Sequence, residues 1–207
     1  MLKFLTRFSL IAALGFGLVT AYAADEAPDV LIKNATNEII DVLKTDKAIQ
    51  AGDVKHTQEV IEAKVLRYFD FNKMTGSAVG REWRNASADQ KAQLAKEFQI
   101  LLVRSYSNAL TQYKNQTVDV KPLKSQPSDT EVTVKTEVKQ PGGKPVAIDY
   151  DLTKAADGWK VYDVYVAGVS LVANYRDTFN QEIKANGIDG LIKSLRDKNA
   201  AKVVEKK

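Results

Sequence analysis

The sequence predicts an α+β fold in which a four-stranded antiparallel sheet is packed against several helices. Before residue 117 and after residue 170, apolar residues recur every three or four positions, a spacing that places them on one side of an α-helix. Between these limits they alternate with polar residues, which is typical of half-buried strands. Turn-forming residues separate the strands at short intervals. This order favours a meander with one apolar face covered by the helices.

The N-terminal segment has the pattern of a secretory signal peptide. Lys3 and Arg7 form a basic start, residues 8–19 are an apolar run, and Ala21–Ala23 matches a small-x-small cleavage site. The apolar run is too short and wrongly flanked for a stable membrane span. We therefore expect residues 1–23 to be a signal peptide that is cleaved after Ala23, and the rest of the chain to be exported.

The composition of the exported chain limits the kinds of protein that it can be. The signal segment contains two cations and no acids, so its removal lowers the formal net charge from +4 to nearly neutral, which does not favour a nucleic-acid partner. The absence of cysteine excludes disulfides, thiol nucleophiles and Cys-ligated metals. Export without disulfides fits a bacterial periplasmic protein. Residues 24–207 suit one domain, whose lysine-rich end from about residue 198 either frays or prolongs the last helix.

Three helices are expected before the longest one. Pro28 and Asp29 suit the first turn of the first helix, because Pro has no amide hydrogen to lose there and Asp complements the helix N-terminus. After a breaker region at 46–52, a second helix is expected over about 56–66. Asp70 or Asn72 caps a short helix over 73–79, which Gly80 ends. The apolar face of the first helix comprises Leu31, Ala35, Ile39, Val42 and Leu43.

The longest helix is predicted over 87–113. Ser87 caps it, and Gln90 three residues later completes a capping-box pattern. Its apolar stripe has two interpretations: a core helix under the sheet, or a helix of which part lines a cavity for an apolar ligand. The stripe comprises Leu94, Phe98, Leu101, Leu102, Tyr106, Ala109, Leu110 and Tyr113.

Four strands are predicted near 117–121, 130–139, 146–152 and 159–166. Turns between them are marked by Pro122, by Pro141–Gly143 and by Asp157–Gly158. The fourth strand is apolar on both faces. The second and third strands have one apolar face each, formed by Val132, Val134, Thr136 and Val138, and by Val146, Ile148, Tyr150 and Leu152.

Two helices are predicted after the sheet. The first begins at Ser170, has Val172, Tyr175, Phe179 and Ile183 on its inner side, and ends at Asn186–Gly187. A shorter helix begins at Asp189.

Residues with catalytic chemistry are sparse. His56 is the one histidine and is expected to be a surface or capping residue, because no Ser partner is near it in sequence. Asp149 and Asp151 share a strand face, with Asp163 on the next strand, but such carboxylates are usually solvated. No phosphate loop, metal-ligand spacing or nucleotide motif occurs. We therefore expect no enzyme activity, no cofactor and no metal.

Two stretches carry a resemblance to a known family. One joins Arg67–Phe71 through Gly80–Arg84 to Phe98–Tyr106, and the other joins Trp159–Val164, Gly168–Val172 and Asn174–Arg176. Over nearly the whole chain after residue 23, the sequence resembles the MlaC family, the periplasmic phospholipid-binding components of the Mla lipid-asymmetry pathway. These proteins are also called toluene-tolerance auxiliary proteins of an ABC transporter.

The resemblance implies a twisted antiparallel sheet with helices packed on it and a deep apolar pocket between them. It also implies a periplasmic carrier that holds a phospholipid by its acyl chains. Its expected partners are an outer-membrane lipoprotein and porin complex, and an inner-membrane ABC transporter complex with a lipid-binding ring subunit.

The implied pocket and the apolar faces above together predict a lining. An alternative function is a periplasmic binding protein for small hydrophobic solutes, and a lipid-modifying enzyme would need a nucleophile or metal. The predicted lining comprises Leu102, Tyr106, Leu110, Val132, Val134, Ile148, Tyr150, Val164, Val169, Val172 and Tyr175.

Overall fold

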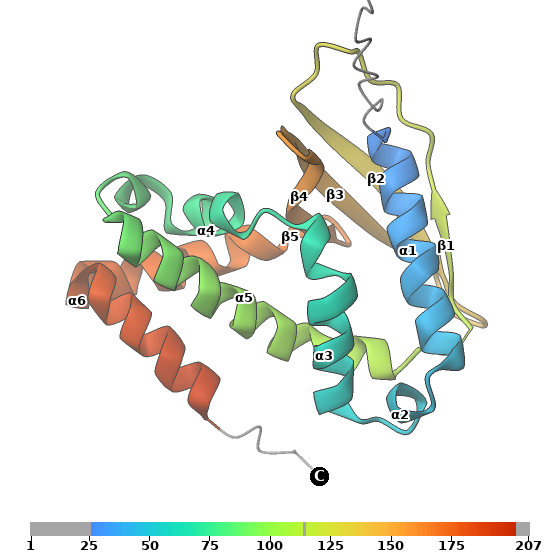
Figure 1. Ribbon diagram of the computed structural model, residues 1–207, viewed down its shortest axis with the longest axis horizontal. Coiled ribbons are helices and arrows are strands. Elements are labelled where there is room, and N and C mark those ends of the chain that lie inside the picture. The colour runs from blue at the N-terminus through green and yellow to red at the C-terminus, as the bar shows by residue number, and fades with distance from the viewer. Residues whose placement is uncertain (1–25, 114, 202–207) are drawn as a thin grey trace, which may run out of the picture.

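In the computed structural model, which describes residues 26–113 and 115–201, a five-stranded antiparallel sheet stands beside a group of packed helices (Figure 1). The predicted fold class is confirmed, with five strands in place of the four expected. The predicted signal peptide and the end of the basic tail lie outside the described residues. In order across the sheet, the strands are β1 (Thr117–Val120), β2 (Glu131–Lys139), β3 (Val146–Ala155), β4 (Gly158–Val166) and β5 (Val169–Ser170).

The additional strand, β5, follows from the backbone at Ala167 and Gly168. Their φ angles are 49° and 81°, and positive φ at both central residues is what a two-residue type I′ hairpin turn requires. The chain therefore reverses at once, and Val166 pairs with Val169. A two-residue strand is too short for an alternating pattern to reveal it.

A register shift in β4 explains why this strand is apolar on both faces. Asp151 of β3 lies opposite Asp163, whereas the next residue, Leu152, lies opposite Val161. Tyr162 is thus an extra residue, as in a β-bulge. Because the bulge changes the alternation, Val161 and Val164 are both buried in one apolar cluster although they are three positions apart.

Most of the helices begin at the residues that were predicted to cap them. Asp70 accepts a hydrogen bond from the Lys73 amide, and Ser87 and Gln90 form the capping box. Two expectations are corrected: the breaker region contains a one-turn helix, and the next helix begins at Val54, because Asp46 and Asp53 each cap a helix. The α-helices are α1 (Pro28–Thr45), α2 (Lys47–Gln50), α3 (Val54–Lys64), α4 (Phe71–Val79), α5 (Ala88–Thr111) and α6 (Leu171–Ala200), with short 3₁₀ helices η1 (Leu66–Tyr68) and η2 (Gly80–Arg84).

α6 contains both of the helices predicted after the sheet. Gly187 breaks it with φ 72° and ψ −177°, a backbone conformation that is essentially restricted to glycine. The helix resumes directly, so the chain bends there without a separate loop. Its last turns extend to Ala200, and the described start of the basic tail therefore prolongs the helix.

The buried apolar side chains form two clusters, although a domain usually has one contiguous core. α4, α5 and α6 pack on one another and contain the first, and α1 lies against β1 and β2 over the second (Figure 1). The helix cluster comprises Met74, Ala78, Val79, Leu94, Phe98, Leu101, Leu102, Val172, Phe179, Leu191, Ile192 and Leu195. The sheet cluster comprises Ile32, Val134, Leu152, Trp159, Val161 and Val164.

Candidate functional site

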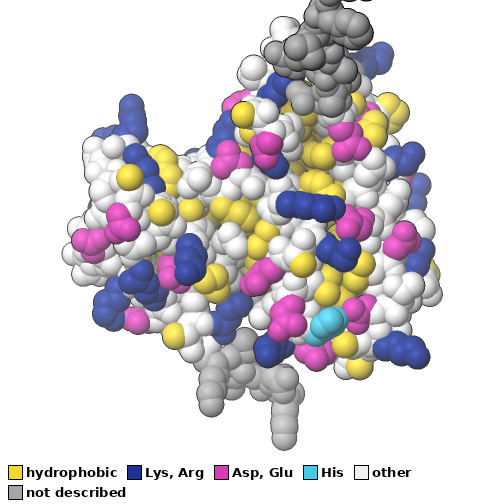
Figure 2. Space-filling view, in the orientation of Figure 1, with side chains coloured by type: hydrophobic (Ala, Val, Ile, Leu, Met, Phe, Trp, Pro, Cys, Tyr) yellow, Lys and Arg dark blue, Asp and Glu magenta, His cyan; other side chains and the backbone are white. Residues whose placement is uncertain are grey.

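The boundary between the helix cluster and the sheet cluster is the candidate site. Phe69 packs against both clusters, and each also has a margin of partly buried apolar side chains. Figure 2 shows apolar side chains in the hollow between the α4–α6 part of the molecule and the part formed by α1 and the sheet. Margins of this kind leave apolar surface available to a ligand. On the sheet side the margin comprises Leu31, Val120, Leu123, Val132, Ile148, Tyr150 and Leu171.

The sheet residues of the predicted lining lie together. Val134, Tyr150 and Val164 are register partners on three adjacent strands, and partners in register point to the same face. Val134 is fully buried, whereas Tyr150 is only partly buried. Val132 and Ile148 extend the same face and are also half-buried. This face is therefore apolar and incompletely covered within the described structure.

Tyr150 places a phenol hydroxyl on this face, which also holds the hydroxyl of Thr136, donated to the carbonyl oxygen of Ile148. Burial raises the pKa of the Tyr150 hydroxyl to about 12, so the phenol is neutral at physiological pH. A neutral phenol in an apolar margin presents its ring to apolar ligands and its hydroxyl to one hydrogen-bond partner. The site therefore has no charge at this position.

The helix residues of the predicted lining form a second group. Leu102 and Val172 are buried in the helix cluster, and Tyr175 packs on its edge with its ring 5.0 Å from that of Phe98. Leu110 is half-buried near the end of α5. Val169 is 53% exposed, because it lies at the tip of the β4–β5 hairpin. The structure thus divides the predicted lining between two clusters and leaves Val169 at the surface.

Tyr106 on α5 and Tyr175 on α6 interact at the edge of the helix cluster. The pKa of Tyr106 is raised mainly by burial of its hydroxyl and, to a smaller extent, by the interaction with Tyr175. The whole Tyr106 side chain is nevertheless 40% exposed. The pair therefore combines an apolar ring edge with a neutral polar group at the surface, an arrangement common at the mouths of ligand sites.

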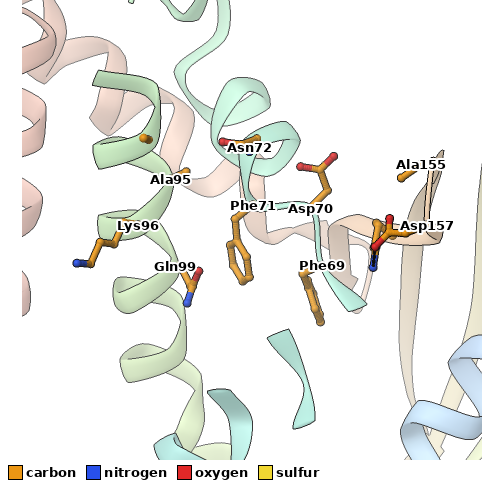
Figure 3. Close-up of a pocket in the computed structure, with 11 residues that line it drawn as sticks. Phe69, Asp70, Phe71, Asn72, Ala95, Lys96, Gln99, Ala155 and Asp157 are labelled. Atoms are coloured by element: carbon orange, nitrogen blue, oxygen red, sulfur yellow. Dashed lines mark ion pairs between the residues drawn. The ribbon is translucent and has the colours of Figure 1, made fainter. Parts of the chain in front are cut away.

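Phe69 was absent from the predicted lining, although it is the residue that the two clusters share. Its ring lies 5.8 Å from that of Phe71, and both rings border a pocket of about 530 Å³ between the start of α4, α5 and the β3–β4 turn (Figure 3). The signal was present as the aromatic run 68–71. Its position between clusters depends on a long-range contact, the parallel bridge of Phe69 to Val161, which a local pattern cannot reveal.

Two of the three carboxylates considered for catalysis, Asp163 and Asp151, have structural partners. Asp163 is buried and accepts hydrogen bonds from the backbone amides of Val164 and Val172 and from the Ser170 hydroxyl. Asp151 accepts a hydrogen bond from Thr133 Oγ1 at 2.6 Å. Asp163 therefore connects β4 to the start of α6, which is a structural function.

His56 lies in the first turn of α3, away from these carboxylates in the chain. Its Nε2 atom is 2.7 Å from Oδ2 of Asp46. Within residues 26–113 and 115–201, no group of three or more His, Cys, Asp or Glu side chains is placed to hold a metal ion. In the same part of the chain, no helix is long and apolar enough to cross a bilayer.

Comparison with known proteins identifies the family. Residues 33–197 match the model of a family described as MlaC protein, a span that covers most of the chain. The chain belongs to the MlaC family. This membership confirms the resemblance seen in the two stretches quoted from the sequence.

Relatives in the MlaC family include two curated proteins. The intermembrane phospholipid transport system binding protein MlaC of Haemophilus influenzae is 24% identical over 191 residues, which cover 90% of this chain and 89% of that protein. The toluene tolerance protein ttg2D of Pseudomonas putida is 25% identical over 201 residues, which cover 91% and 87% of the two chains.

A solved structure of a similar protein contains a ligand. The phospholipid-binding protein from Ralstonia solanacearum, in complex with a phospholipid, is 34% identical in sequence and superimposes with a TM-score of 0.78. The match covers 84% of this chain and 98% of that one. Its fold is therefore the same as the fold described above.

Proposed function

We propose that this protein is a phospholipid carrier that holds acyl chains between the helix cluster and the sheet cluster, with the headgroup toward solvent. The observation that supports it is the divided core: two apolar clusters share Phe69 and have half-buried apolar margins. The proposal is further supported by the relative from Ralstonia solanacearum, which has the same fold and was solved in complex with a phospholipid.

The energetics of lipid transfer suit a protein of this kind. A phospholipid exposes about 30 methylene groups at roughly 0.8 kcal/mol each, so on the order of 25 kcal/mol opposes its passage through water. An apolar cavity in a protein recovers most of that free energy. Exchange between a bilayer and the cavity then has a small net driving force, and the direction of transport depends on the partners.

The proposed location is the periplasm, which the signal-peptide pattern of residues 1–23 supports. There the protein carries phospholipid between an outer-membrane complex and an inner-membrane complex that contains an ABC transporter. The relative from Haemophilus influenzae is named for an intermembrane phospholipid transport system, which supports this assignment. The exported segment, residues 24–207, acts as one lipid-binding domain.

The proposed acyl-chain lining is the predicted set with Phe69 added. Ile148 and Tyr150 are the sharpest positions to test, because they are half-buried and an Arg there disturbs folding less than one at the fully buried Val134. Ile148→Arg and Tyr150→Arg each place a cation on the apolar face. Ala147→Arg is the matched control, since Ala147 is exposed and directly precedes Ile148 in the same strand, so that its side chain lies on the opposite face.

The measurement is mass spectrometry of solvent extracts from each purified protein, with circular dichroism as the check of folding. We expect phospholipid from the wild type and from Ala147→Arg, and little or none from the two margin variants, because a desolvated cation opposes acyl-chain binding. Normal phospholipid in folded margin variants would place the lining elsewhere. A small hydrophobic solute in place of phospholipid would overturn the proposed cargo.

A further inference from the structure

A second pocket lies outside the proposed acyl-chain lining and has a different chemistry. It has a volume of about 710 Å³ and lies between the end of α4, η2 and the first part of α6. None of its residues belongs to the predicted lining. They are Ser77, Gly80, Arg81, Glu82, Arg176, Asn180, Ile183 and Lys184.

The pocket has an excess of positive charge. Its cations are Arg81, Arg176 and Lys184, and Glu82 is the carboxylate among its lining residues. Glu82 accepts a hydrogen bond from Asn85 at 2.8 Å and pairs with Arg81 at 3.4 Å. Within the described residues, Arg176 and Lys184 have no carboxylate at ion-pair distance. Two cations in the pocket are therefore available to an anion.

Arg176 is held in position by its own backbone contact. Its Nε and Nη2 atoms donate to the carbonyl oxygen of Ser77 at 3.3 Å and 3.1 Å. A guanidinium group has five N–H donors, so donors remain for a ligand. Asn180 and Lys184 follow at intervals of four, which places them on the same face of α6 as Arg176. Two donors of different kinds thus stand beside a preorganised guanidinium.

We propose that this pocket binds a phosphate-type oxyanion, either free phosphate or the phosphate of a lipid headgroup at a membrane surface. The planar fork of Arg matches the geometry of phosphate oxygens, and Lys adds a point charge that tolerates several orientations. Ile183 provides an apolar wall against which the glycerol part of a headgroup can rest. The site does not depend on the acyl-chain cavity, so it binds the oxyanion in delipidated protein as well.

The experiment uses two probes with the full mature protein. Inorganic phosphate is titrated while amide NMR shifts are followed, and flotation is measured with phosphatidylglycerol vesicles and with phosphatidylcholine vesicles. The variants are Arg176→Gln and Lys184→Gln. Lys193→Gln is the control, because it removes the same charge from α6 at a position that is 77% exposed and outside the pocket.

We expect saturable phosphate binding that each pocket variant weakens about tenfold, the loss typical of one charge-assisted hydrogen bond, and that Lys193→Gln leaves unchanged. Flotation with phosphatidylglycerol that depends on the same two residues assigns the headgroup as the source, and phosphate binding without it assigns the free anion. Lys184→Gln keeps the test decisive if Arg176→Gln alters folding. Equal losses in the control, or no saturable binding of either probe, would overturn the proposal.

Discussion

His56 couples the start of α3 to the cap of α2. Its hydrogen bond to Asp46 raises the pKa of His56 above its ordinary value of 6.5. The same bond, together with the amides that Asp46 caps, holds the pKa of that carboxyl below 3.8. The two side chains are partly exposed, so the pair contributes modestly and is weakened by salt. Its contribution nevertheless depends on pH in a defined direction.

The stabilisation from His56 should be present at mildly acidic pH and lost at alkaline pH. A group whose pKa is raised by folding stabilises the folded state fully below its unfolded pKa, and loses this effect as the pH rises through the folded pKa. In urea unfolding, the free energy of unfolding of the wild type should therefore exceed that of His56→Gln most between about pH 5 and pH 6, and the difference should decrease as the pH rises through the raised pKa of His56. Lys55→Gln should give a difference that does not change over this range. A His56→Gln difference that grows with pH would contradict the pairing.

Hydrogen bonds between residues a few positions apart in the chain could be predicted from the sequence. Ser87 with Gln90 and Ser170 are caps in the structure because the hydrogen bonds they make join residues three positions apart. The partner of His56 could not be predicted, since Asp46 is ten residues away and faces it only after the α2 turn has formed. Phe69 was missed for the same reason at larger separation.

At the scale of elements, the junction between β4 and α6 is fixed by a buried carboxylate. Asp163 accepts from the amide of its neighbour Val164 at 2.8 Å and from the Val172 amide at 3.2 Å. It also accepts from the hydroxyl of Ser170, the cap of α6. Since Val172 belongs to the helix cluster and Val164 to the sheet cluster, this one side chain ties the two clusters together.

Replacing Asp163 with Ala should destabilise the protein by about 2–4 kcal/mol, because two buried backbone amides lose their acceptor. Equilibrium unfolding in urea measures this as a lower midpoint. Asp149→Ala is the control on the neighbouring strand, where the side chain has no hydrogen bond or ion pair in the described structure, and should change stability by less than about 0.5 kcal/mol. Equal effects of the two substitutions would show that the junction does not depend on Asp163.

The order and type of the larger elements followed from periodicity, whereas three details did not. β5 is too short to have a period, and the bulge at Tyr162 interrupts the alternation of β4 without a Gly or Pro to mark it. At Gly187, the pattern predicted the end of one helix and the start of another, and the structure joins them. β5 depends on the backbone conformation of Ala167 and Gly168, and the bulge depends on the pairing of β4 with β3.

At the scale of the whole molecule, the divided core could not be predicted from apolar faces alone. Periodicity identifies which side chains turn inward, so Val134, Tyr150, Leu102 and Val172 were all expected inside. It does not give the position of the α5–α6 pair relative to the sheet, where the hydrogen bonds of Asp163 join β4 to α6. A single core and two clusters that share Phe69 have the same sequence pattern.

A core that is completed by lipid should be less stable without it. Ligand that binds only the folded state at a hundredfold excess over its Kd adds about 2.7 kcal/mol to the free energy of unfolding. For a domain of this size each kcal/mol shifts Tm by roughly 2–4 °C, so removal of the lipid should lower Tm by about 5–10 °C.

The measurement is calorimetry on protein as purified and after extraction of the lipid under conditions from which it refolds. Ile148→Arg, which should carry no lipid, supplies the comparison: extraction should leave its Tm unchanged. Were the Tm of the wild type equally unchanged by extraction, lipid would not complete the core, and the acyl chains would have to bind elsewhere.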